Sequence, residues 1–283
     1  EIVQACKGSE AVSDDDVSIA GQIIRHNVTH MQCTPSMARL LTMNDEASHA
    51  LKHVKHLYLG GEALPGTLVG QLEELTDADV TNMYGPTETT IWSSTAPATR
   101  REMTANIGQP IANTSLYVVD EGLNPVPFGV PGELLIGGAG VTRGYWKRDD
   151  LTADRFVDDP FGGSGKLYRT GDLVQRRLDG AFDFIGRADH QVKLRGYRIE
   201  LGEIESRLED LASISQAVVI TREDTPGDVR LVAYTIGNAT EAQMRDQLNA
   251  NVPSYMVPSH FVRLDAFPLT PNKKIDRKAL PAP

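Results

Sequence analysis

Residues 54–86 carry the sequence VKHLYLGGEALPGTLVGQLEELTDADVTNMYGP. The apolar run Val54–Leu59 predicts a strand that ends at a glycine pair. Leu64–Leu75 places its leucines at helical spacing, and Val80–Tyr84 predicts a second strand that ends at Gly85-Pro86. A strand, a helix and a second strand in this order favour a parallel β-α-β unit, whose ligand-binding loops leave the carboxyl ends of the strands.

The residues ahead of this stretch repeat the alternation of helix and strand. Asp16–His26 has apolar residues at helical spacing after acidic residues that suit the start of a helix. Val28–Gln32 then predicts a strand, and Ser36–Leu41 predicts a further helix. We therefore expect an α/β fold built on a parallel sheet.

From about Ile107 onward the sequence is typical of short strands separated by Gly, Pro and Asp-Gly turns. The strand candidates are Ser115–Val119, Gly132–Ile136, Leu173–Arg176 and Ala181–Ile185. Beyond Asp189, strands and helices alternate again as strand Gln191–Leu194, helix Gly202–Leu211, strands Ala217–Thr221 and Leu231–Ile236, helix Glu241–Ala250 and strand His260–Leu264. The sequence thus predicts a first domain with a parallel sheet and a run of short strands, and a second domain, residues 190–283, with a small α+β fold.

The composition is that of an ordinary globular protein. Of the 283 residues, 40% are hydrophobic and 23% charged, and 28 basic against 38 acidic residues give a net charge of −10. This balance argues against nucleic acid or an anionic membrane surface as the main partner. No apolar stretch approaches the roughly 20 residues of a membrane helix, and neither a signal-peptide pattern nor a disulfide framework is present, so a cytoplasmic location is expected. Because the chain opens at Glu1 rather than Met, we expect it to begin partway along a longer polypeptide.

Three segments carry candidate chemistry. Asn82–Thr90 follows a strand end and offers hydroxyl groups and the Glu88 carboxylate, which suit a nucleotide phosphate and a hard cation such as Mg²⁺; a hairpin turn before a Thr-rich strand fits the spacing equally well. Gly132–Trp146 is rich in glycine, but no amphipathic helix follows it, so a dinucleotide-binding turn is not expected. Tyr168–Leu173 predicts a tight turn at which Asp172 either accepts hydrogen bonds from a ribose diol or caps the turn.

Two charged segments and a histidine cluster are weaker signals. Gly186–Glu200 and the basic loop Pro271–Lys278 each describe, by themselves, a solvated surface. His49, His53 and His56 have the spacing of one helix face that could bind zinc, but strand character begins beside them and no carboxylate joins them. No metal site is therefore expected at these histidines.

Taken together and in this order, six segments resemble the adenylate-forming (AMP-binding) enzymes, and among them the adenylation domains of nonribosomal peptide synthetases. The segments are Tyr84–Glu88, Gly132–Trp146, Tyr168–Leu173, Gly186–Glu205, Tyr255–Pro258 and Asn272–Leu280. The resemblance covers nearly the whole chain. It implies that residues 1–188 are the C-terminal part of a large AMP-binding core domain, with a parallel sheet and a small β-barrel-like region. Residues 189–283 would then be a small mobile C-terminal domain of α+β fold.

The resemblance implies an ATP-dependent ligase that works in two steps. In the first, an amino acid or related carboxylic acid attacks the α-phosphate of ATP, and pyrophosphate leaves. In the second, the phosphopantetheine thiol of a peptidyl carrier protein domain takes the acyl group. The implied partners are that carrier and the neighbouring modules of a synthetase for nonribosomal peptides or hybrid polyketides.

The resemblance also implies roles for single residues in nucleotide binding. Asn82 and Tyr84 would face the adenine, by hydrogen bonding and by stacking. Thr87 would contact phosphate and Glu88 would hold Mg²⁺. Asp172 and Arg187 would bind the ribose, and Gly85 and Phe184 would complete the nucleotide site.

Three further roles follow from the resemblance for residues near or beyond the domain boundary. Lys274 would reach the α-phosphate and the substrate carboxylate, where its ammonium group matches the negative charge of the transition state. Asp189 would be the hinge about which the small domain swings between the two steps. Lys193 and Gly196 would belong to the loop that serves thiol transfer.

Six residues at matching positions would line the acid pocket, namely Gln32, Tyr58, Gly60, Met83, Ile91 and Trp92. They would form a mostly apolar cavity in which Trp92 fills space and Gln32 offers one amide, which favours a substrate with an apolar body. Each of the six could equally be an ordinary core residue.

Two departures from the family pattern bear on this interpretation. The chain has Asn272-Lys273-Lys274 where the family has Asn-Gly-Lys, and the Ser/Thr/Gly-rich phosphate loop expected ahead of Tyr84 is not in the sequence. We therefore expect the chain to be the C-terminal piece of an adenylation domain. The alternatives are a stand-alone acyl-CoA or aryl-acid ligase of the same superfamily and a truncated, non-catalytic interaction module; the segment Gln191–Glu205 favours a carrier thiol over coenzyme A.

Overall fold

The computed structural model describes residues 17–163, 165–188, 191–225, 228–270 and 275–283. It divides the chain into two compact units, Glu1–Ala188 (unit 1) and Asp189–Pro283 (unit 2). Each unit has hydrophobic clusters of its own. Asp189 and Lys274 fall outside the described residues.

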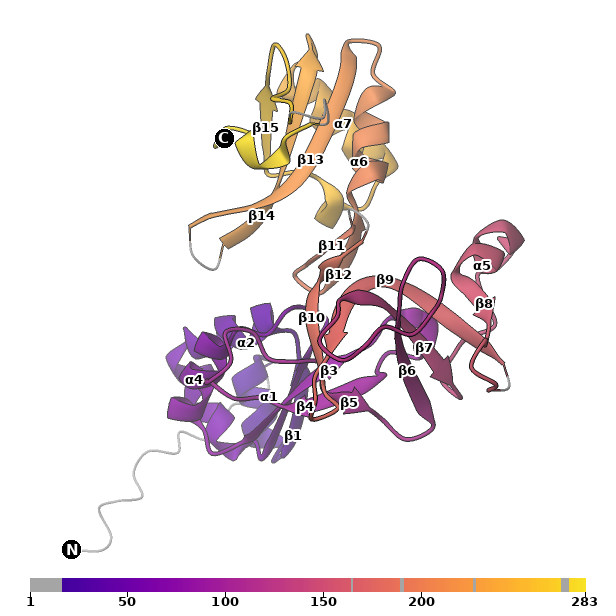
Figure 1. Cartoon of the computed structure of the whole chain (residues 1–283). Coiled ribbons are helices and arrows are strands. Elements are labelled where there is room, and N and C mark those ends of the chain that lie inside the picture. Colours follow the sequence, from indigo (N-terminus) through magenta and orange to yellow (C-terminus); the bar gives the residue numbers. More distant parts are fainter. Residues whose placement is uncertain (1–16, 164, 189–190, 226–227, 271–274) are drawn as a thin grey trace, which may run out of the picture. The chain divides into compact units, whose positions relative to one another are not determined.

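Unit 1 begins with a sheet in the strand order β1-β2-β3-β4-β5 (Figure 1). Its strands are β1 (His30–Cys33), β2 (His56–Gly60), β3 (Asp79–Tyr84), β4 (Ser94–Pro97) and β5 (Gln109–Pro110). The first three strands run parallel, so the predicted parallel sheet is confirmed. β4 and β5 join antiparallel, and the sequence pattern misses them because so few residues give no readable alternation.

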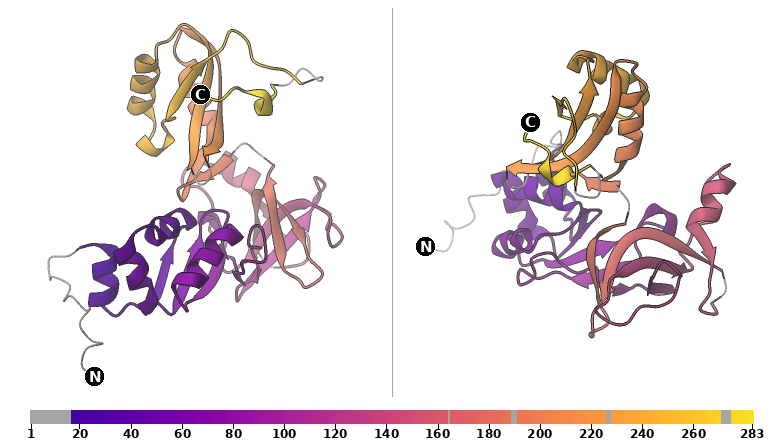
Figure 2. Two further views of the ribbon diagram at one scale, coloured as in Figure 1. Left: turned by 90° about the vertical axis from the view of Figure 1, so that its left-hand side faces the viewer. Right: turned by 45° about the horizontal axis from the view of Figure 1, so that its top comes forward.

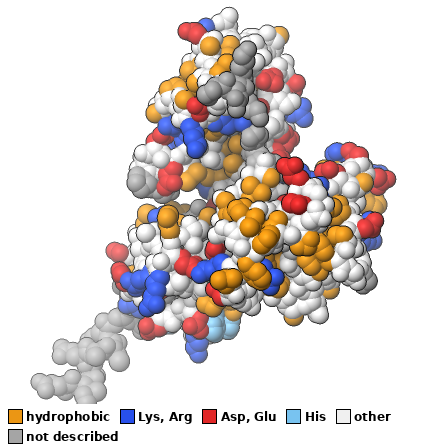
Figure 3. All heavy atoms as spheres, viewed as in Figure 1, with side chains coloured by type: hydrophobic (Ala, Val, Ile, Leu, Met, Phe, Trp, Pro, Cys, Tyr) orange, Lys and Arg blue, Asp and Glu red, His pale blue; other side chains and the backbone are white. Residues whose placement is uncertain are grey.

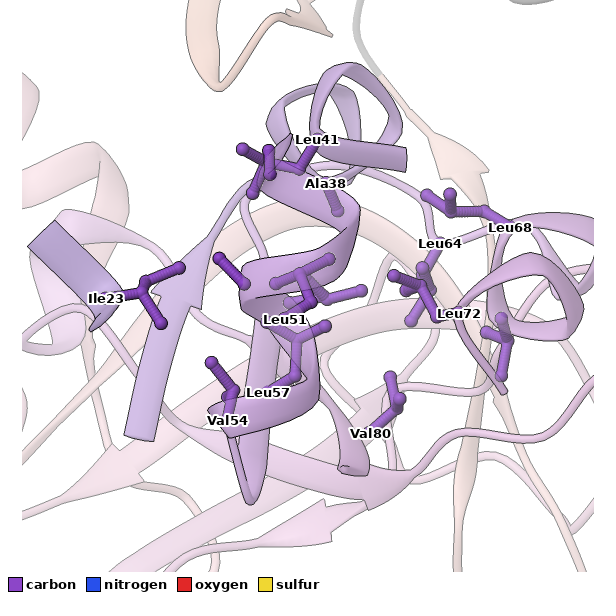
Figure 4. Packing of buried hydrophobic residues seen from close by; sticks show 14 of the residues in the cluster. Ile23, Ala38, Leu41, Leu51, Val54, Leu57, Leu64, Leu68, Leu72 and Val80 are labelled. Atoms are coloured by element: carbon purple, nitrogen blue, oxygen red, sulfur yellow. The ribbon is translucent and has the colours of Figure 1, made fainter. Parts of the chain in front are cut away.

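Helices cover one face of this sheet, as Figures 1 and 2 show. They are α1 (Ile19–Arg25), α2 (Pro35–Thr42), α3 (Asp45–Ala50) and α4 (Gly66–Leu75), with the 3₁₀ turn η1 (Leu51–His53) after α3. Ser18, Thr34 and Asn44 cap the first three helices by accepting a backbone N–H, which satisfies a donor that the helix itself cannot. Leu51 and Leu68 are buried between the helices and the sheet (Figure 4).

The two faces of the sheet carry different residues, because side chains alternate along a strand. Leu57, Leu59 and Val80 are buried in the helix-covered core. The intervening Tyr58 lies on the opposite face, where it is half-buried. Cys33, at the end of β1, is half-buried against the core, and burial raises the pKa of its thiol to about 11.

Unit 1 continues with an antiparallel sheet in the order β10-β9-β7-β6, with β8 beside β9. The elements are β6 (Thr114–Val119), β7 (Gly132–Gly138), α5 (Asp149–Arg155), β8 (Phe156–Asp158), β9 (Lys166–Arg176) and β10 (Phe182–Arg187). Ile107 N–H donates to the Phe182 carbonyl at 2.8 Å, which joins this sheet to the loop ahead of β5.

The prediction of a tight turn at Tyr168–Leu173 is wrong. These residues lie inside β9, where the pairing with β7 steps from Glu133–Leu173 to Leu135–Arg169. The residues between, Thr170–Asp172, form a β-bulge in which Gly171 has φ 71°. The glycine that suggests a turn in the sequence therefore marks a bulge in one long strand.

Unit 2 has a sheet in the order β13-β14-β15 and a separate hairpin, β11-β12. Its elements are β11 (Gln191–Leu194), β12 (Tyr197–Glu200), α6 (Leu201–Glu209), β13 (Ile214–Thr225), β14 (Asp228–Gly237), α7 (Glu241–Asn251), η3 (Ser254–Met256), β15 (His260–Arg263) and η4 (Arg277–Ala279). Leu208 of α6 and Leu248 of α7 pack on one face of the sheet, and Phe267 and Leu280 pack on the other. The predicted α/β fold followed by a small α+β fold is confirmed.

On the face that Figure 3 shows, acidic and basic side chains are interspersed, and apolar side chains reach the surface of unit 1. Exposed apolar residues include Phe128, Trp146 and Leu178. In the part of the chain that the structure describes, no helix is long and apolar enough to cross a membrane.

Candidate functional site

The loop after β3 and the glycine-rich segment after β7 lie against each other. The loop includes the 3₁₀ turn η2 (Thr87–Thr89). Thr90 Oγ1 donates to the Gly140 carbonyl at 2.7 Å, and Thr142 N–H donates to the Glu88 carbonyl at 2.9 Å. A Cβ on Gly140 would lie 2.8 Å from the Thr89 carbonyl oxygen, so the close approach requires glycine. Two motifs that stand about fifty residues apart therefore form one surface.

The loop after β3 also folds back on its own start. Ser93 N–H donates to the Tyr84 carbonyl at 2.8 Å, and a Cβ on Gly85 would lie 2.4 Å from the Ile91 carbonyl oxygen. β3 and β4 pair antiparallel on either side, so the hairpin that the sequence left open is present, with a long connection that holds Glu88. Thr87 is exposed on this connection.

Glu88 is held by Tyr145, whose hydroxyl donates to Glu88 Oε1 at 2.6 Å. Tyr145 N–H donates to Thr152 Oγ1 at 2.9 Å, and the tyrosine ring stands edge-on to Phe156 with 5.6 Å between ring centroids. Burial, followed by the bond to Glu88, raises the pKa of Tyr145, so the hydroxyl keeps its proton. The Glu88 carboxylate is thus half-buried and oriented by a fixed donor.

Asp172 lies at the centre of a buried cluster formed by strands β3, β9 and β10. The Tyr84 hydroxyl donates to Asp172 Oδ2, and Arg187 Nη1 donates to Asp172 Oδ1 at 2.5 Å. The Arg187 and Asp172 side chains are only 9% and 4% exposed. The structure therefore brings Tyr84, predicted to face the adenine, together with Asp172 and Arg187, both predicted to bind the ribose.

The bulge in β9 orients this cluster. Thr170 Oγ1 donates to the Leu134 carbonyl at 2.7 Å and accepts from Asp172 N–H at 2.9 Å. Arg187 Nη2 donates to the Thr170 carbonyl at 3.1 Å. Because each carboxylate oxygen can accept more than one hydrogen bond, Asp172 retains acceptor capacity beside its two bound donors.

Tyr84 is buried among apolar residues that include Phe182 of the second sheet and Ile107 of the loop ahead of β5. Burial and the neighbouring Asp172 carboxylate raise the pKa of Tyr84 well above its usual value, so its hydroxyl acts as a donor to Asp172. Phe184 is partly buried against the same cluster.

Asn82 presents a buried acceptor. Its Nδ2 donates to the Asn106 carbonyl at 2.8 Å. Its Oδ1 is buried and has no hydrogen-bond partner among the described residues. A buried acceptor without a donor costs about 1–3 kcal/mol, and a ligand that supplies a donor recovers that free energy.

Four of the six predicted pocket residues share one face of the first sheet. The registers pair Gln32 with Tyr58 and Gly60 with Met83, on the face opposite the helices. A Cβ on Gly60 would lie 2.5 Å from Trp92 Cη2, so the indole lies directly on the Gly60 backbone. Trp92 therefore belongs to this group, whereas Ile91 is 59% exposed on the loop after β3.

The remaining predicted residues belong to other elements of the chain. Lys193 and Gly196 belong to the β11-β12 hairpin of unit 2, where Gly196 has φ 79°. His49 lies in α3 and His56 in β2, so the three histidines do not share a helix. Within the described ranges, no three His, Cys, Asp or Glu side chains gather as metal ligands.

Sequence reasoning misses Tyr145, Asn106 and Glu102. Tyr145 lies within Gly132–Trp146, one of the six family segments, so its place beside the glycines is a signal that could have identified it. Asn106 and Glu102 lie in the irregular connection between β4 and β5, where no periodicity or motif marks them.

The sequence profile of the family described as AMP-binding enzyme matches residues 6–146, and that of the AMP-binding enzyme C-terminal domain matches residues 203–274. The chain belongs to the AMP-binding enzymes. The six ordered segments and the fold agree with this membership.

Among curated relatives, the chain is 51% identical over 271 residues to a dimodular nonribosomal peptide synthase of Bacillus subtilis (strain 168), a match that covers 94% of this chain and 11% of the relative. A solved nonribosomal peptide synthetase protein with adenylation and PCP domains, in its holo form bound to a vinylsulfonamide inhibitor, aligns with a TM-score of 0.82 at 30% identity over 92% of this chain and 45% of its own. A solved four-domain holo synthetase bound to AMP and glycine aligns with a TM-score of 0.57 at 43% identity over 96% of this chain and 20% of its own. The chain thus spans about a tenth of that curated relative and less than half of either solved chain.

Proposed function

We propose that the chain is part of an adenylation domain that activates an amino acid with ATP and passes it to a carrier-protein thiol during nonribosomal peptide biosynthesis. A substrate carboxylate oxygen bonds to the α-phosphorus, the bond from that phosphorus to the bridging oxygen of pyrophosphate breaks, and an acyl-adenylate forms. The carrier's phosphopantetheine thiolate then bonds to the acyl carbon, and AMP leaves.

The arrangement around Tyr84 is the observation that carries this proposal. Its strand and the following loop hold Asn82, Tyr84 and Glu88 within seven residues, and the β9 bulge brings Asp172 to the Tyr84 hydroxyl. The unpartnered Asn82 acceptor fits an amine of the nucleobase, and the Asp172 carboxylate fits ribose hydroxyls. The family match supports the same assignment.

Glu88 has the donor chemistry that a nucleotide-bound Mg²⁺ needs, since this ion commonly takes one or two carboxylates, phosphate oxygens and several waters. Bound there, Mg²⁺ would neutralise charge on the phosphates. Tyr145 would keep the Glu88 carboxylate aimed at one place, and Thr87 would offer a hydroxyl to phosphate. We further propose that Lys274 neutralises the α-phosphate and that Asp189 is the hinge between the two steps.

We also propose that the substrate is a small amino acid such as glycine. The Trp92 indole lies on Gly60, and in the predicted pocket it would fill space that a larger substrate side chain needs. The sequence favours a substrate with an apolar side chain, and this packing restricts that side chain to a small size. The 43% identical synthetase bound to AMP and glycine supports the same substrate.

Substrate-dependent exchange of pyrophosphate into ATP tests both the adenylation function and the assignment of a small substrate. It is measured with the protein at its natural length and with a panel of amino, hydroxy and aryl acids. We expect exchange with glycine and weak exchange with leucine or phenylalanine. Trp92→Ala should shift the preference toward a larger side chain by about tenfold or more, because one well-filled apolar contact is worth about 1–3 kcal/mol. Leu178→Ala, a change at an exposed apolar residue outside the predicted pocket, is the control.

The outcomes separate the proposals. No exchange with any acid contradicts the adenylation function. Exchange with large acids in the unchanged protein contradicts the small-substrate assignment alone. Transfer to coenzyme A in place of a holo carrier protein would favour the acyl-CoA ligase alternative.

A further inference from the structure

A series of hydrogen bonds links Asn82 to Arg177 through Asn106 and Glu102, which lie in none of the six family segments. Asn82 Nδ2 donates to the Asn106 carbonyl at 2.8 Å. Asn106 N–H donates to Glu102 Oε2 at 3.0 Å, and Asn106 Nδ2 donates to the same carboxylate at 3.1 Å. Arg177 Nη1, from the connection between β9 and β10, donates to Glu102 Oε1 at 2.8 Å.

This series of hydrogen bonds fixes the orientation of the Asn82 side-chain amide. The carbonyl oxygens of Ala105 and Asn106 can only accept, so the amide NH₂ must face them and Oδ1 must face away. The backbone on either side of these two carbonyls is held in place. Ala105 N–H donates to the Leu64 carbonyl at 2.9 Å, and Ile107 N–H donates to the Phe182 carbonyl of the second sheet. Asn82 therefore presents an acceptor in one orientation.

Glu102 is suited to hold this arrangement as an anion. Its side chain is 24% exposed and contacts Arg177 and Asn106 at once. Partial burial acts to raise the pKa of Glu102, but the hydrogen bonds from Arg177 and Asn106 outweigh it and hold the pKa below its ordinary value. The carboxylate is therefore ionised near neutral pH and accepts from both partners.

We propose that Glu102 is a positioning residue that, through Asn106, makes Asn82 select a nucleobase with an exocyclic amine. This inference rests on the proposed function, because it requires the nucleotide to contact Asn82. An amine at the 6-position of a purine would donate to Asn82 Oδ1, whereas a carbonyl there would set oxygen against oxygen. Adenine is thereby favoured over hypoxanthine, and Glu102, which does not touch the base, orients the Asn82 acceptor that makes this selection.

The test compares dissociation constants for three nucleotides in the protein at its natural length. ATP carries the 6-amino group, purine riboside triphosphate lacks it, and inosine triphosphate has a carbonyl in its place. The variants are Glu102→Ala, which removes both acceptors, and Glu102→Gln, which keeps an acceptor for Asn106 but loses the charge opposite Arg177. Glu74→Ala, an exposed glutamate paired with Arg100 at 3.4 Å on α4, is the matched control.

In the unchanged protein and in Glu74→Ala, we expect ATP to bind about tenfold more tightly than purine riboside triphosphate, which is the effect of one buried hydrogen bond. Glu102→Ala should reduce this ratio to about twofold, with Glu102→Gln between the two, while binding of purine riboside triphosphate barely changes. An equal loss for both nucleotides, or an unchanged ratio, would overturn the inference. If Glu102→Ala does not fold, the ratio measured for Glu102→Gln decides; absence of ATP binding in the unchanged protein contradicts the proposed function instead.

Discussion

Two carboxylates of unit 1 that are both assigned to the nucleotide differ in their surroundings. Asp172 is buried, with the Arg187 guanidinium and the Tyr84 hydroxyl bound directly to it. Glu88 is half-buried on a loop, where the Tyr145 hydroxyl donates to one of its carboxylate oxygens. Asp172 is therefore part of the structure that holds three strands together, whereas Glu88 is presented by that structure.

The difference teaches that stability and activity should separate at these two positions. Removing one partner of a buried ion pair leaves an uncompensated charge, which costs far more than the pair itself contributes. Glu88 lies half-buried on a loop, where replacement by glutamine keeps an acceptor for Tyr145 and should cost little stability. Three experiments test this difference between Asp172 and Glu88.

The largest effect is expected for Asp172→Ala. The Arg187 guanidinium would remain buried without its carboxylate, so the free energy of unfolding should fall by about 3–5 kcal/mol. Chemical denaturation measures this. Asp150→Ala, which removes an exposed carboxylate paired with Arg148, is the control and should leave the denaturation midpoint unchanged. Equal stability of the two variants would mean that Asp172 is not structural.

Glu88→Gln should lower activity while leaving the free energy of unfolding nearly unchanged. Glutamine can still accept from Tyr145, so the denaturation midpoint should stay close to that of the unchanged protein. Pyrophosphate exchange should fall by about 10²- to 10³-fold, the usual cost of removing one electrostatic contact to a transition state. Glu121→Gln, on an exposed turn, should retain activity. A Glu88→Gln protein that exchanges normally would remove the cation from the proposed site.

The smallest effect concerns alkaline pH. Tyr84 ionises at a higher pH in the folded protein than in the unfolded chain, where its pKa is about 10. Above that pH the folded state holds the proton that the unfolded state has lost, so stability falls with rising pH by up to about 1.4 kcal/mol per unit. This contribution is fully present below about pH 10.

Tyr84→Phe should remove that part of the alkaline decline, at a cost of about 1 kcal/mol at neutral pH from the lost hydrogen bond. Denaturation midpoints measured between pH 7 and about pH 11 compare it with Tyr117→Phe, a tyrosine stacked on Phe161 at 4.4 Å between ring centroids. Parallel pH profiles for the unchanged and Tyr84→Phe proteins would contradict the assignment.

Local patterns predicted much of unit 1. Val54–Tyr84 alternates apolar strands with an amphipathic helix, and the parallel order of β1, β2 and β3 follows from that alternation. The bulge at Gly171 was mistaken for a turn, because a glycine with positive φ serves both and the sequence does not say whether strand pairing continues beyond it.

The family of this protein and the residue types of its candidate site can be predicted from the sequence, because the motifs at Tyr84–Glu88 and Tyr168–Leu173 are contiguous in the chain. Folding is needed to show which residues come into contact: Tyr84 with Asp172, Glu88 with Tyr145, and Asn82 with a loop held by Glu102. The physical reason is that these contacts join segments distant along the chain through burial and hydrogen-bond direction, and neither leaves a periodic mark in the sequence.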